Sequence, residues 1–261
     1  MDTPLILITN DDGMFAPGIK ALVEVAKMHG EIVVVAPNSP QSGQGHAISL
    51  TTPLRLHKVD VFKEVEAYEC SGTPADCVKL AKHVVLKDRN IDLCVSGINH
   101  GSNASINIIY SGTMSAAMEA SLEGIKSIGF SLLDLAFEAD FTGAKYYANQ
   151  IIKYALGNDL GAGKLLNVNI PNLKLDEIKG IKICKQGNAS WREKFQEGKD
   201  PRGETYYWLA GNFIVTEQPK DSDLWALSNG YVSVVPSHHD LTQYASLEPL
   251  KSLENHVNKN I

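Results

Sequence analysis

Two adjacent carboxylates, Asp11 and Asp12, follow a short apolar run near the start of the chain. The run, Leu5–Thr9, is continuous and is typical of a strand that is buried on both faces. Neighbouring carboxylates at the end of such a strand repel each other, which favours a proton or a hard cation between them. The alternative is a plain turn in which Gly13 takes a positive φ, and the Asn10–Gly13 tetrapeptide taken alone favours that turn.

A second polar loop follows the next apolar run, Glu31–Ala36. It contains Ser42, whose hydroxyl is a weak ligand for a hard ion, and Gly43, whose backbone N–H can reach a phosphate oxygen. Taken alone, this segment indicates nothing more than a loop.

A third polar loop follows the apolar run Asp92–Ser96. Asn99 offers an amide oxygen, a common companion of carboxylates around Mg²⁺ or Mn²⁺. Further on, Ser111, Gly112 and Thr113 come just before an expected helix, whose free N–H groups and dipole favour an anion. Simple N-capping by one of the two hydroxyls explains this segment equally well.

Apolar runs and helical patterns alternate along the first 170 residues, which indicates an α/β fold with a mostly parallel sheet and helices on both faces. Loops that follow parallel strands gather at one edge of the sheet, where ligands bind. The expected strands are Leu5–Thr9, Glu31–Ala36, Leu54–Lys58, Val65–Cys70, Asp92–Ser96, Ser127–Ser131 and Leu165–Ile170. The expected helices are Gly18–Met28, Thr73–Val85, Thr113–Leu122 and Phe141–Leu156.

Together, the three loops predict a kind of site that none of them indicates alone. Oxygen ligands on strand-end loops, beside a helix start that contains glycine, are what a metal-assisted phosphate site needs. No GxGxxG follows the first strand and no GxxxxGK[ST] occurs, so the sequence gives no support for a dinucleotide-binding or P-loop protein.

Composition restricts the classes of partner. The chain has 261 residues, 44% of them hydrophobic, and a formal net charge of −6, which argues against disorder and against nucleic-acid polymers as partners. No apolar stretch is long enough to span a membrane and no signal peptide is recognisable, so we expect a cytoplasmic protein. The four cysteines form no CxxC, and we expect buried, reduced thiols.

The pattern changes beyond Pro171. The segment 186–223 is polar, contains scattered Trp and Tyr, and lacks a helical period, so we expect hairpins or an extended arm between strands at Ile181–Lys185 and Tyr231–Pro236. We divide the chain softly into a core, 1–180, and closing elements, 181–261, within a single domain overall. The histidines near Asp240 are interpreted as part of a solvated loop, while His100 is equally compatible with a general acid and with a hydrogen-bonded loop histidine.

Seven segments in order resemble the SurE family of stationary-phase survival proteins. These are TNDDG, APGI, VVVAPNSPQSGQGHAISL, GTPADCVKLA, VSGINHGSN, IYSGTMSAAMEA and SDLWALSNGYVSVVPSHHDLT. The resemblance implies a Rossmann-like core with a C-terminal β-hairpin extension exchanged between subunits in a homodimer or homotetramer. It also implies metal-dependent hydrolysis of nucleoside 5′- and 3′-monophosphates, with some action on short polyphosphate.

The resemblance also implies roles for individual residues. One divalent ion per subunit, Mg²⁺ or Mn²⁺, is expected on Asp11, Asp12, Ser42 and Asn99. Phosphate is expected at Gly43, Asn99, Ser111, Gly112 and Thr113. Asp11 or Asp12 would also act as the catalytic base, and the sequence does not distinguish between them.

Two other classes stay open. A covalent aspartyl phosphatase of the haloacid dehalogenase type needs two Asp residues spaced D-x-D, whereas here the pair is adjacent. A nucleotide- or metal-sensing subunit would use the same ligands without turnover, so only an activity measurement separates it from an enzyme.

Overall fold

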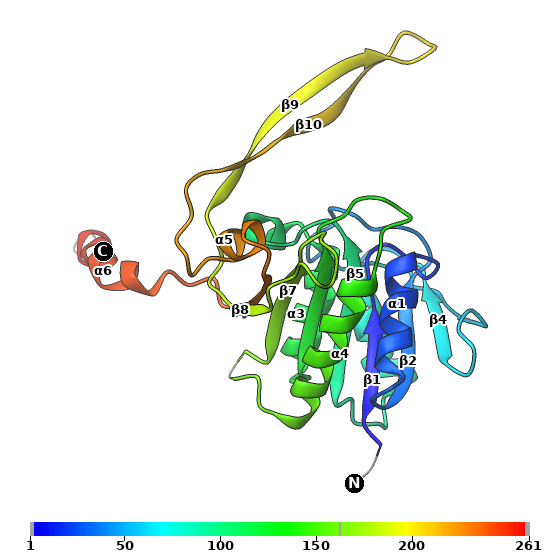
Figure 1. Cartoon of the computed structure of the whole chain (residues 1–261). Coiled ribbons are helices and arrows are strands. Elements are labelled where there is room, and N and C mark those ends of the chain that lie inside the picture. Colours follow the sequence, from blue (N-terminus) through cyan, green and yellow to red (C-terminus); the bar gives the residue numbers. More distant parts are fainter. Residues whose placement is uncertain (1–2, 162, 259–261) are drawn as a thin grey trace.

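A nine-stranded sheet forms the centre of the computed structural model, which describes residues 3–161 and 163–258 (Figure 1). The strand order is β3-β4-β2-β1-β5-β6-β7-β11-β8. The strands from β4 to β7 in this order run parallel, β3 and β11 are antiparallel to their neighbours β4 and β7, and β8 is parallel to β11. Their bounds are β1 (Leu5–Thr9), β2 (Glu31–Pro37), β3 (Leu56–Val59), β4 (Glu66–Cys70), β5 (Leu93–His100), β6 (Ser127–Leu132), β7 (Leu165–Ile170), β8 (Ile181–Ile183) and β11 (Val232–Ser237).

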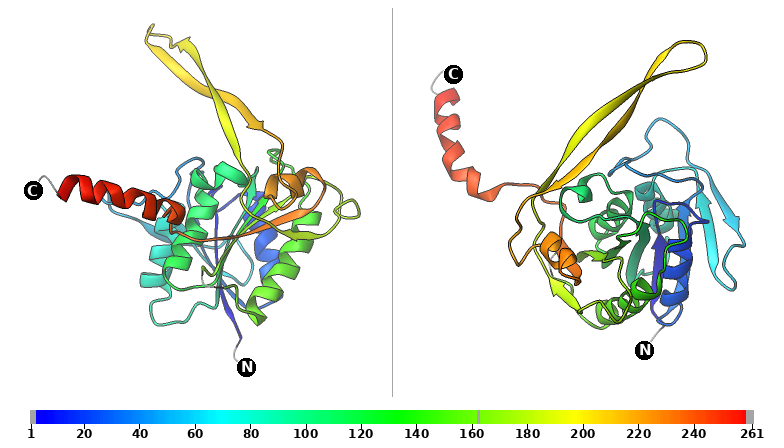
Figure 2. Two further views of the ribbon diagram at one scale, coloured as in Figure 1. Left: turned by 90° about the vertical axis from the view of Figure 1, so that its left-hand side faces the viewer. Right: turned by 45° about the horizontal axis from the view of Figure 1, so that its top comes forward.

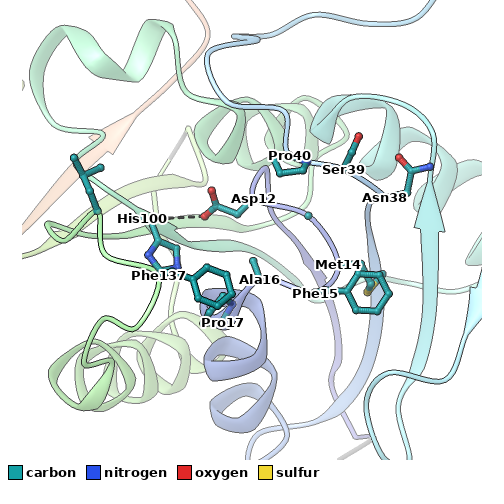
Figure 3. Close-up of a pocket in the computed structure, with 12 residues that line it drawn as sticks. Asp12, Met14, Phe15, Ala16, Pro17, Asn38, Ser39, Pro40, His100 and Phe137 are labelled. Carbon is teal, nitrogen blue, oxygen red and sulfur yellow. Dashed lines mark hydrogen bonds between the residues drawn. The ribbon is translucent and has the colours of Figure 1, made fainter.

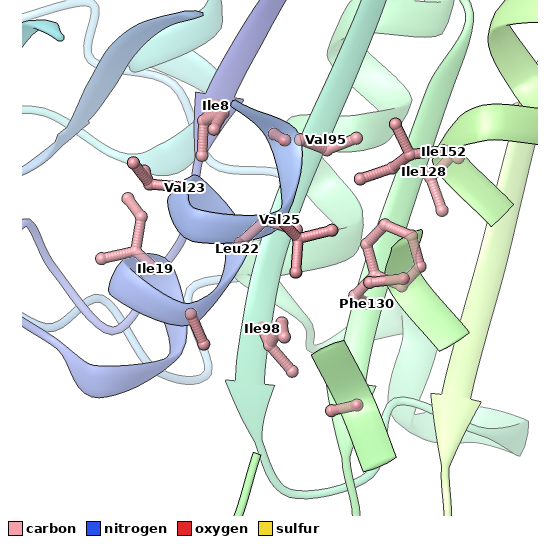
Figure 4. Close-up of a cluster of buried hydrophobic side chains, with 14 of the residues drawn as sticks. Ile8, Ile19, Leu22, Val23, Val25, Val95, Ile98, Ile128, Phe130 and Ile152 are labelled. Atoms are coloured by element: carbon pink, nitrogen blue, oxygen red, sulfur yellow. The ribbon is translucent and has the colours of Figure 1, made fainter. Parts of the chain in front are cut away.

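Helices cover both faces of this sheet, as the sequence predicts. Alternate side chains of β1 enter different hydrophobic clusters: Ile6 and Ile8 pack with α1 (Pro17–Ala26) and α4 (Thr142–Gly157), as Figure 4 shows in part. On the opposite face, the cluster of Leu5 and Leu7 includes side chains of α2 (Pro74–Leu80) and α3 (Gly112–Leu122). Burial on both faces explains why these central strands are continuous apolar runs.

The order of the strands places a switch point beside β1. The chain passes from β1 to β2 on one side and later returns to β5 on the other side. Connections that leave in opposite directions open a crevice at the carboxyl ends of such strands. The Asp11–Asp12 pair follows β1, and Asn99 lies in β5, so both borders of this crevice carry predicted ligands.

The structure corrects one helix of the core. The predicted helix Thr73–Val85 begins as expected, with a capping box between Thr73 and Asp76. It ends at Leu80, however, and a single π-helical segment, η1 (Ala81–Val85), continues the chain. Helical spacing alone does not distinguish these two kinds of turn.

A long antiparallel hairpin projects from the body of the molecule, as expected for the segment 186–223 (Figure 1). It consists of β9 (Ala189–Lys199) and β10 (Thr205–Val215). Two helices in this part of the chain were not predicted: α5 (Asp223–Ser228), and α6 (Leu247–Asn258), which stands away from the sheet (Figure 2). None of the helices in the described ranges combines the length and apolar character needed to cross a membrane.

Candidate active site

The turn after β1 presents the two carboxylates at the crevice. Gly13 has a φ of +95°, and the Asn10 side-chain amide donates to the Gly13 carbonyl at 2.9 Å. The Met14 N–H donates to the Pro37 carbonyl at 2.9 Å, which joins the turn to the second polar loop. The plain turn considered for this tetrapeptide therefore exists, and it holds the carboxylates in place.

Asp11 is the buried member of the pair, with 4% of its surface exposed. The Thr113 hydroxyl donates to Asp11 Oδ1, and a Cβ on Gly112 would lie 2.6 Å from Asp11 Cβ, so only glycine fits there. Burial raises the pKa of Asp11 to about 6, the charge of Asp12 adds to this shift, and the bonds from Thr113 oppose it. Asp11 is thus held against the N-terminus of α3, whose dipole favours its charged form.

Asp12 and Asn99 stand at the two borders of the crevice, at the carboxyl ends of β1 and β5. Asp12 Oδ2 accepts the His100 backbone N–H at 3.2 Å, and burial raises the pKa of Asp12 against the effect of that bond. The Asn99 amide nitrogen donates to the Gly101 carbonyl at 2.8 Å. In the described part of the chain nothing donates to Asn99 Oδ1, so this oxygen remains free for a ligand.

Backbone contacts at both ends hold the second loop over the site. The Gln41 N–H donates to the carbonyl of Asp11 at 2.7 Å, and the Gly45 N–H donates to the carbonyl of Tyr110 at 3.1 Å. The segment 42–43 therefore spans the gap between the carboxylate turn and the residue that precedes the cap of α3.

Ser42 and Gly43 are exposed within this span. Gly43 has a φ of +73°, and no atom lies within 4 Å of where its Cβ would be, so its backbone faces open space. The buried carboxylate of Glu119 steadies the loop further on, because His46 Nε2 lies 2.8 Å from it in a hydrogen bond and the partly exposed Lys79 Nζ lies 2.5 Å from it in a salt bridge. Burial would raise the pKa of Glu119, but its bonds from His46 and Lys79 outweigh that effect and lower it.

The helix start at Ser111–Thr113 uses its hydroxyls internally. Ser111 Oγ accepts the Met114 N–H at 3.0 Å, which is the N-cap considered from the sequence, and the Thr113 hydroxyl is committed to Asp11. What this segment can offer a ligand is therefore its backbone N–H groups and the dipole of α3.

Several buried polar atoms around the carboxyl ends of β1 and β5 have no partner within the described chain. They are Thr9 Oγ1, Asn10 Oδ1, Ser96 Oγ and both ring nitrogens of His100. Buried polar atoms without a partner are rare and point to a ligand, ion or water that completes the site. Carboxylate, amide and hydroxyl oxygens fit a hard divalent cation such as Mg²⁺ or Mn²⁺.

The third loop is anchored by contacts that the sequence does not reveal. The amide of Asn103 donates to Ser131 Oγ at 2.8 Å, and its backbone N–H donates to Asn169 Oδ1 at 2.8 Å. Two residues later, the Ser105 N–H donates at 2.8 Å to the buried carboxylate of Asp223, in α5. Asp223 also accepts the N–H of Gly187, just before the hairpin, at 2.7 Å.

A cavity of about 420 Å³ opens next to Asp12 (Figure 3). No cavity was predicted from the sequence, and four of the residues that line it, Met14, Phe15, Leu135 and Phe137, belong to none of the recognised motifs. The signal was available, because Leu135 and Phe137 stand in the loop directly after the strand predicted at Ser127–Ser131. The lining consists of Asp12, Gly13, Met14, Phe15, Ala16, Pro17, Asn38, Ser39, Pro40, His100, Leu135 and Phe137.

Other candidates stay outside the site. All four cysteines are buried and free, as expected. His238 Nδ1 accepts the Asp240 N–H at 3.1 Å within an exposed loop. Over residues 3–161 and 163–258, no three or more His, Cys, Asp or Glu side chains gather as a metal-binding group, so a metal at the crevice would also need the neutral oxygen donors.

Fold and site together define an α/β protein with an oxygen-rich polar site at the switch point of a mostly parallel sheet. The chain belongs to the SurE family, because the family model described as Survival protein SurE matches residues 6–193.

Relatives match this chain over nearly its whole length. A protein from Cytophaga hutchinsonii named 5′-nucleotidase SurE is 57% identical over 250 residues, 96% of each chain. A relative of the same name from Christiangramia forsetii is 56% identical, with 95% of this chain and 96% of the relative covered. The crystal structure of the SurE protein from Aquifex aeolicus aligns with a TM-score of 0.82 at 43% identity, covering 96% of this chain and all of the other.

Proposed function

We propose that this protein is a divalent-metal-dependent phosphomonoesterase that hydrolyses nucleoside 5′- and 3′-monophosphates and, to a lesser extent, short polyphosphate. The observation that carries the proposal is the convergence of Asp11, Asp12 and Asn99 with the N-terminus of α3 at the switch point. The relatives named 5′-nucleotidase SurE support a nucleotidase, and the donor chemistry supports the metal.

The metal would be held by Asp11, Asp12, Asn99 and Ser42. When bound, it polarises the phosphate and makes nearby water more acidic. Asp11 holds one oxygen in a fixed place, because its other oxygen is bonded to Thr113. Ser42 would reach the site from its loop, which is anchored on the carbonyl of Asp11.

We assign the base to Asp12 rather than to Asp11. Asp12 lines the cavity and is only partly buried, so it can receive a proton from water beside a bound substrate. Asp11 is enclosed and hydrogen-bonded to Thr113, so it positions the site.

The substrate phosphate would lie between Gly43, Asn99 and the start of α3. The backbone N–H groups of the segment 111–113 and the helix dipole stabilise negative charge that builds up on its oxygens. None of the residues that line the adjacent cavity is Lys or Arg, so backbone dipoles and the cation carry this task. We further propose that the hairpin β9–β10 joins chains into a homodimer or homotetramer.

The test is release of phosphate from 5′-AMP and 3′-AMP in Mn²⁺, in Mg²⁺ and in EDTA, with Asp12→Ala as the control for contaminating phosphatase. We expect metal-dependent release that falls at least about 100-fold in EDTA and in the variant. Metal-dependent binding of AMP without any release would contradict the proposal and favour the sensing subunit.

A further inference from the structure

The cavity beside Asp12 has an apolar wall that hydrolysis of a phosphate ester does not itself require. Phe15 and Phe137 line it with 56% and 68% of their surfaces exposed. In the view of Figure 3 their rings stand on either side of Ala16, below Asp12. Large exposed aromatic side chains around a hollow are typical of a binding site.

The loop that carries Phe137 is fixed at both ends. At its start, the Leu133 N–H donates to the carbonyl of Ile170 at 2.9 Å. At its end, the Thr142 N–H donates to Asp140 Oδ1 at 2.8 Å, where α4 begins. The first bond ties the start of this loop to the end of β7, and the second is a local turn at the start of α4.

His100 supplies a polar group between this wall and the carboxylate. Its ring packs edge-on against Phe141, with centroids 5.3 Å apart, and its backbone N–H is bonded to Asp12. Both ring nitrogens are buried without a partner in the described chain, although the residue lines the cavity. The ring of His100 can donate a hydrogen bond to a ligand in the cavity or accept one from it.

Apart from Asp12, the cavity walls contain no Asp, Glu, Lys or Arg. A second phosphate group would find no positive charge here, whereas a flat, uncharged ring would find apolar contact on the walls. The volume of about 420 Å³ falls within the usual range for small-molecule pockets.

We propose that this cavity holds the nucleoside part of the substrate, with the base against Phe15 and Phe137 and a sugar hydroxyl hydrogen-bonded to the ring of His100. The inference rests on the proposed function and specifies its substrate. We place the sugar at His100 and the base further out, because the sugar lies between phosphate and base, and the backbone N–H of His100 is bonded to Asp12. The cavity thus makes the enzyme prefer nucleotides over phosphate esters that lack a base.

The test compares 5′-AMP with ribose 5-phosphate, which keeps the phosphate and sugar but has no base. Stacking of a base on an aromatic side chain has an effect of roughly tenfold or more. We therefore expect Phe137→Ala and Phe15→Ala to lower kcat/KM for 5′-AMP about tenfold, through KM, and to change ribose 5-phosphate less than about twofold. Tyr154→Ala removes a ring of similar exposure, 59%, outside the cavity and should change neither substrate.

Variants of His100 should behave differently from variants of the two phenylalanines. His100→Ala should raise KM for both substrates alike, because both carry the sugar, while His100→Asn should restore most of the loss through its amide. Equal effects of Phe137→Ala on both substrates, or no effect on either, would overturn the base contact. No effect of His100→Ala would overturn the sugar contact.

Adenosine binding tests the nucleoside site independently of the proposed hydrolysis. Its binding to metal-free protein, followed by calorimetry, needs neither phosphate nor turnover, and should weaken about tenfold in Phe137→Ala. Absence of adenosine binding, or equal binding by the variant, would overturn the inference even if the enzyme hydrolyses AMP. A change of oligomeric state in Phe137→Ala, seen by light scattering, would also overturn it, because the loop would then contact a second copy.

Discussion

The carboxylate site and the C-terminal hairpin differ in how they meet their surroundings. At the site, Asp11 is buried and bonded to a residue 102 positions away, and each polar loop is anchored at several points. The hairpin exposes large side chains to solvent, with Trp208 and Leu209 67% and 65% exposed. The hydrogen bonds that hold the carboxylate site thus come from the same chain. The exposed apolar side chains of the hairpin, in contrast, are not covered by any described part of that chain.

The two regions differ because they meet different physical requirements. A metal-phosphate site must be preorganised, and buried hydrogen bonds from a packed core achieve that. An isolated two-stranded hairpin is marginal in water, and exposed apolar surface of this kind marks an interface. Asp223 is where the two regions meet, because it binds both the loop after β5 and the residue Gly187 at the base of the hairpin.

The largest expected effect therefore comes from Asp223→Ala. The substitution leaves the buried N–H groups of Ser105 and Gly187, and the partly buried N–H of Leu224, without their acceptor. We expect a loss of about 3–5 kcal/mol in the free energy of unfolding. Denaturant unfolding measures it. Asp221→Ala, which breaks only the exposed pair with Lys185, should cost less than about 1 kcal/mol. Similar losses in both variants would contradict the link between the two regions.

The next effect concerns pH. Burial and the charge of Asp12 raise the pKa of Asp11 to about 6 from 3.8, so the folded protein binds this proton more tightly than the unfolded chain does. The contribution of Asp11 to stability is therefore full below pH 4 and is lost as pH rises through 6, a loss on the order of 3 kcal/mol without metal. Urea unfolding in EDTA should show Asp11→Asn gaining stability relative to wild type between pH 4 and 7.5. A constant difference would contradict the burial of this charge.

Thr113→Val tests whether the hydroxyl of Thr113 is needed to orient Asp11 for metal binding. The change keeps the shape of the side chain but removes the hydroxyl that orients Asp11, so Mn²⁺ should bind roughly 10- to 100-fold more weakly. Thr113→Ser keeps the hydroxyl and should retain most of the affinity. Calorimetric titration compares them, and wild-type affinity in the valine variant would mean that Asp11 needs no such support.

The smallest effect on the fold of a single chain is expected in the hairpin. Leu209 pairs with Phe195, and both are exposed, so Leu209→Asp should dissociate the proposed oligomer at micromolar concentration while circular dichroism stays unchanged. Val84→Asp places the same charge on another exposed aliphatic position and should leave the mass from light scattering unaltered. An unchanged mass for Leu209→Asp would show that chains associate through another surface.

Much of the fold could be predicted, because its strands are continuous apolar runs that end at clear breakers. The strands β1 and β7 have the bounds that the sequence indicates, and both the residue pattern of 186–223 and the family resemblance predicted a hairpin there. The helix α6 was missed although Leu247, Leu250 and Leu253 recur every three residues. Polar residues surround these three leucines, so the apolar face of the helix is weak in the sequence.

The site was predictable only in part. Motifs placed Asp11, Asp12 and Asn99 at strand ends, and the parallel sheet brings these ends together. The contact between Ser105 and Asp223 spans 118 residues, and no local pattern indicates it. Phe137 belongs to no motif; its place in the loop after a predicted strand can be read from the sequence, but that it lines a cavity is shown only by the fold. The metal-ligand and phosphate-binding roles stay predictions.

The most direct test of the central claim is calorimetric titration of Mn²⁺ into wild type and into Asp11→Asn, Asp12→Asn and Asn99→Ala, each checked for folding by circular dichroism. We expect one site per chain in wild type and a loss of affinity of at least about tenfold in every variant. Wild-type affinity in all three folded variants, or no binding by wild type, would contradict a metal centre at this edge of the sheet.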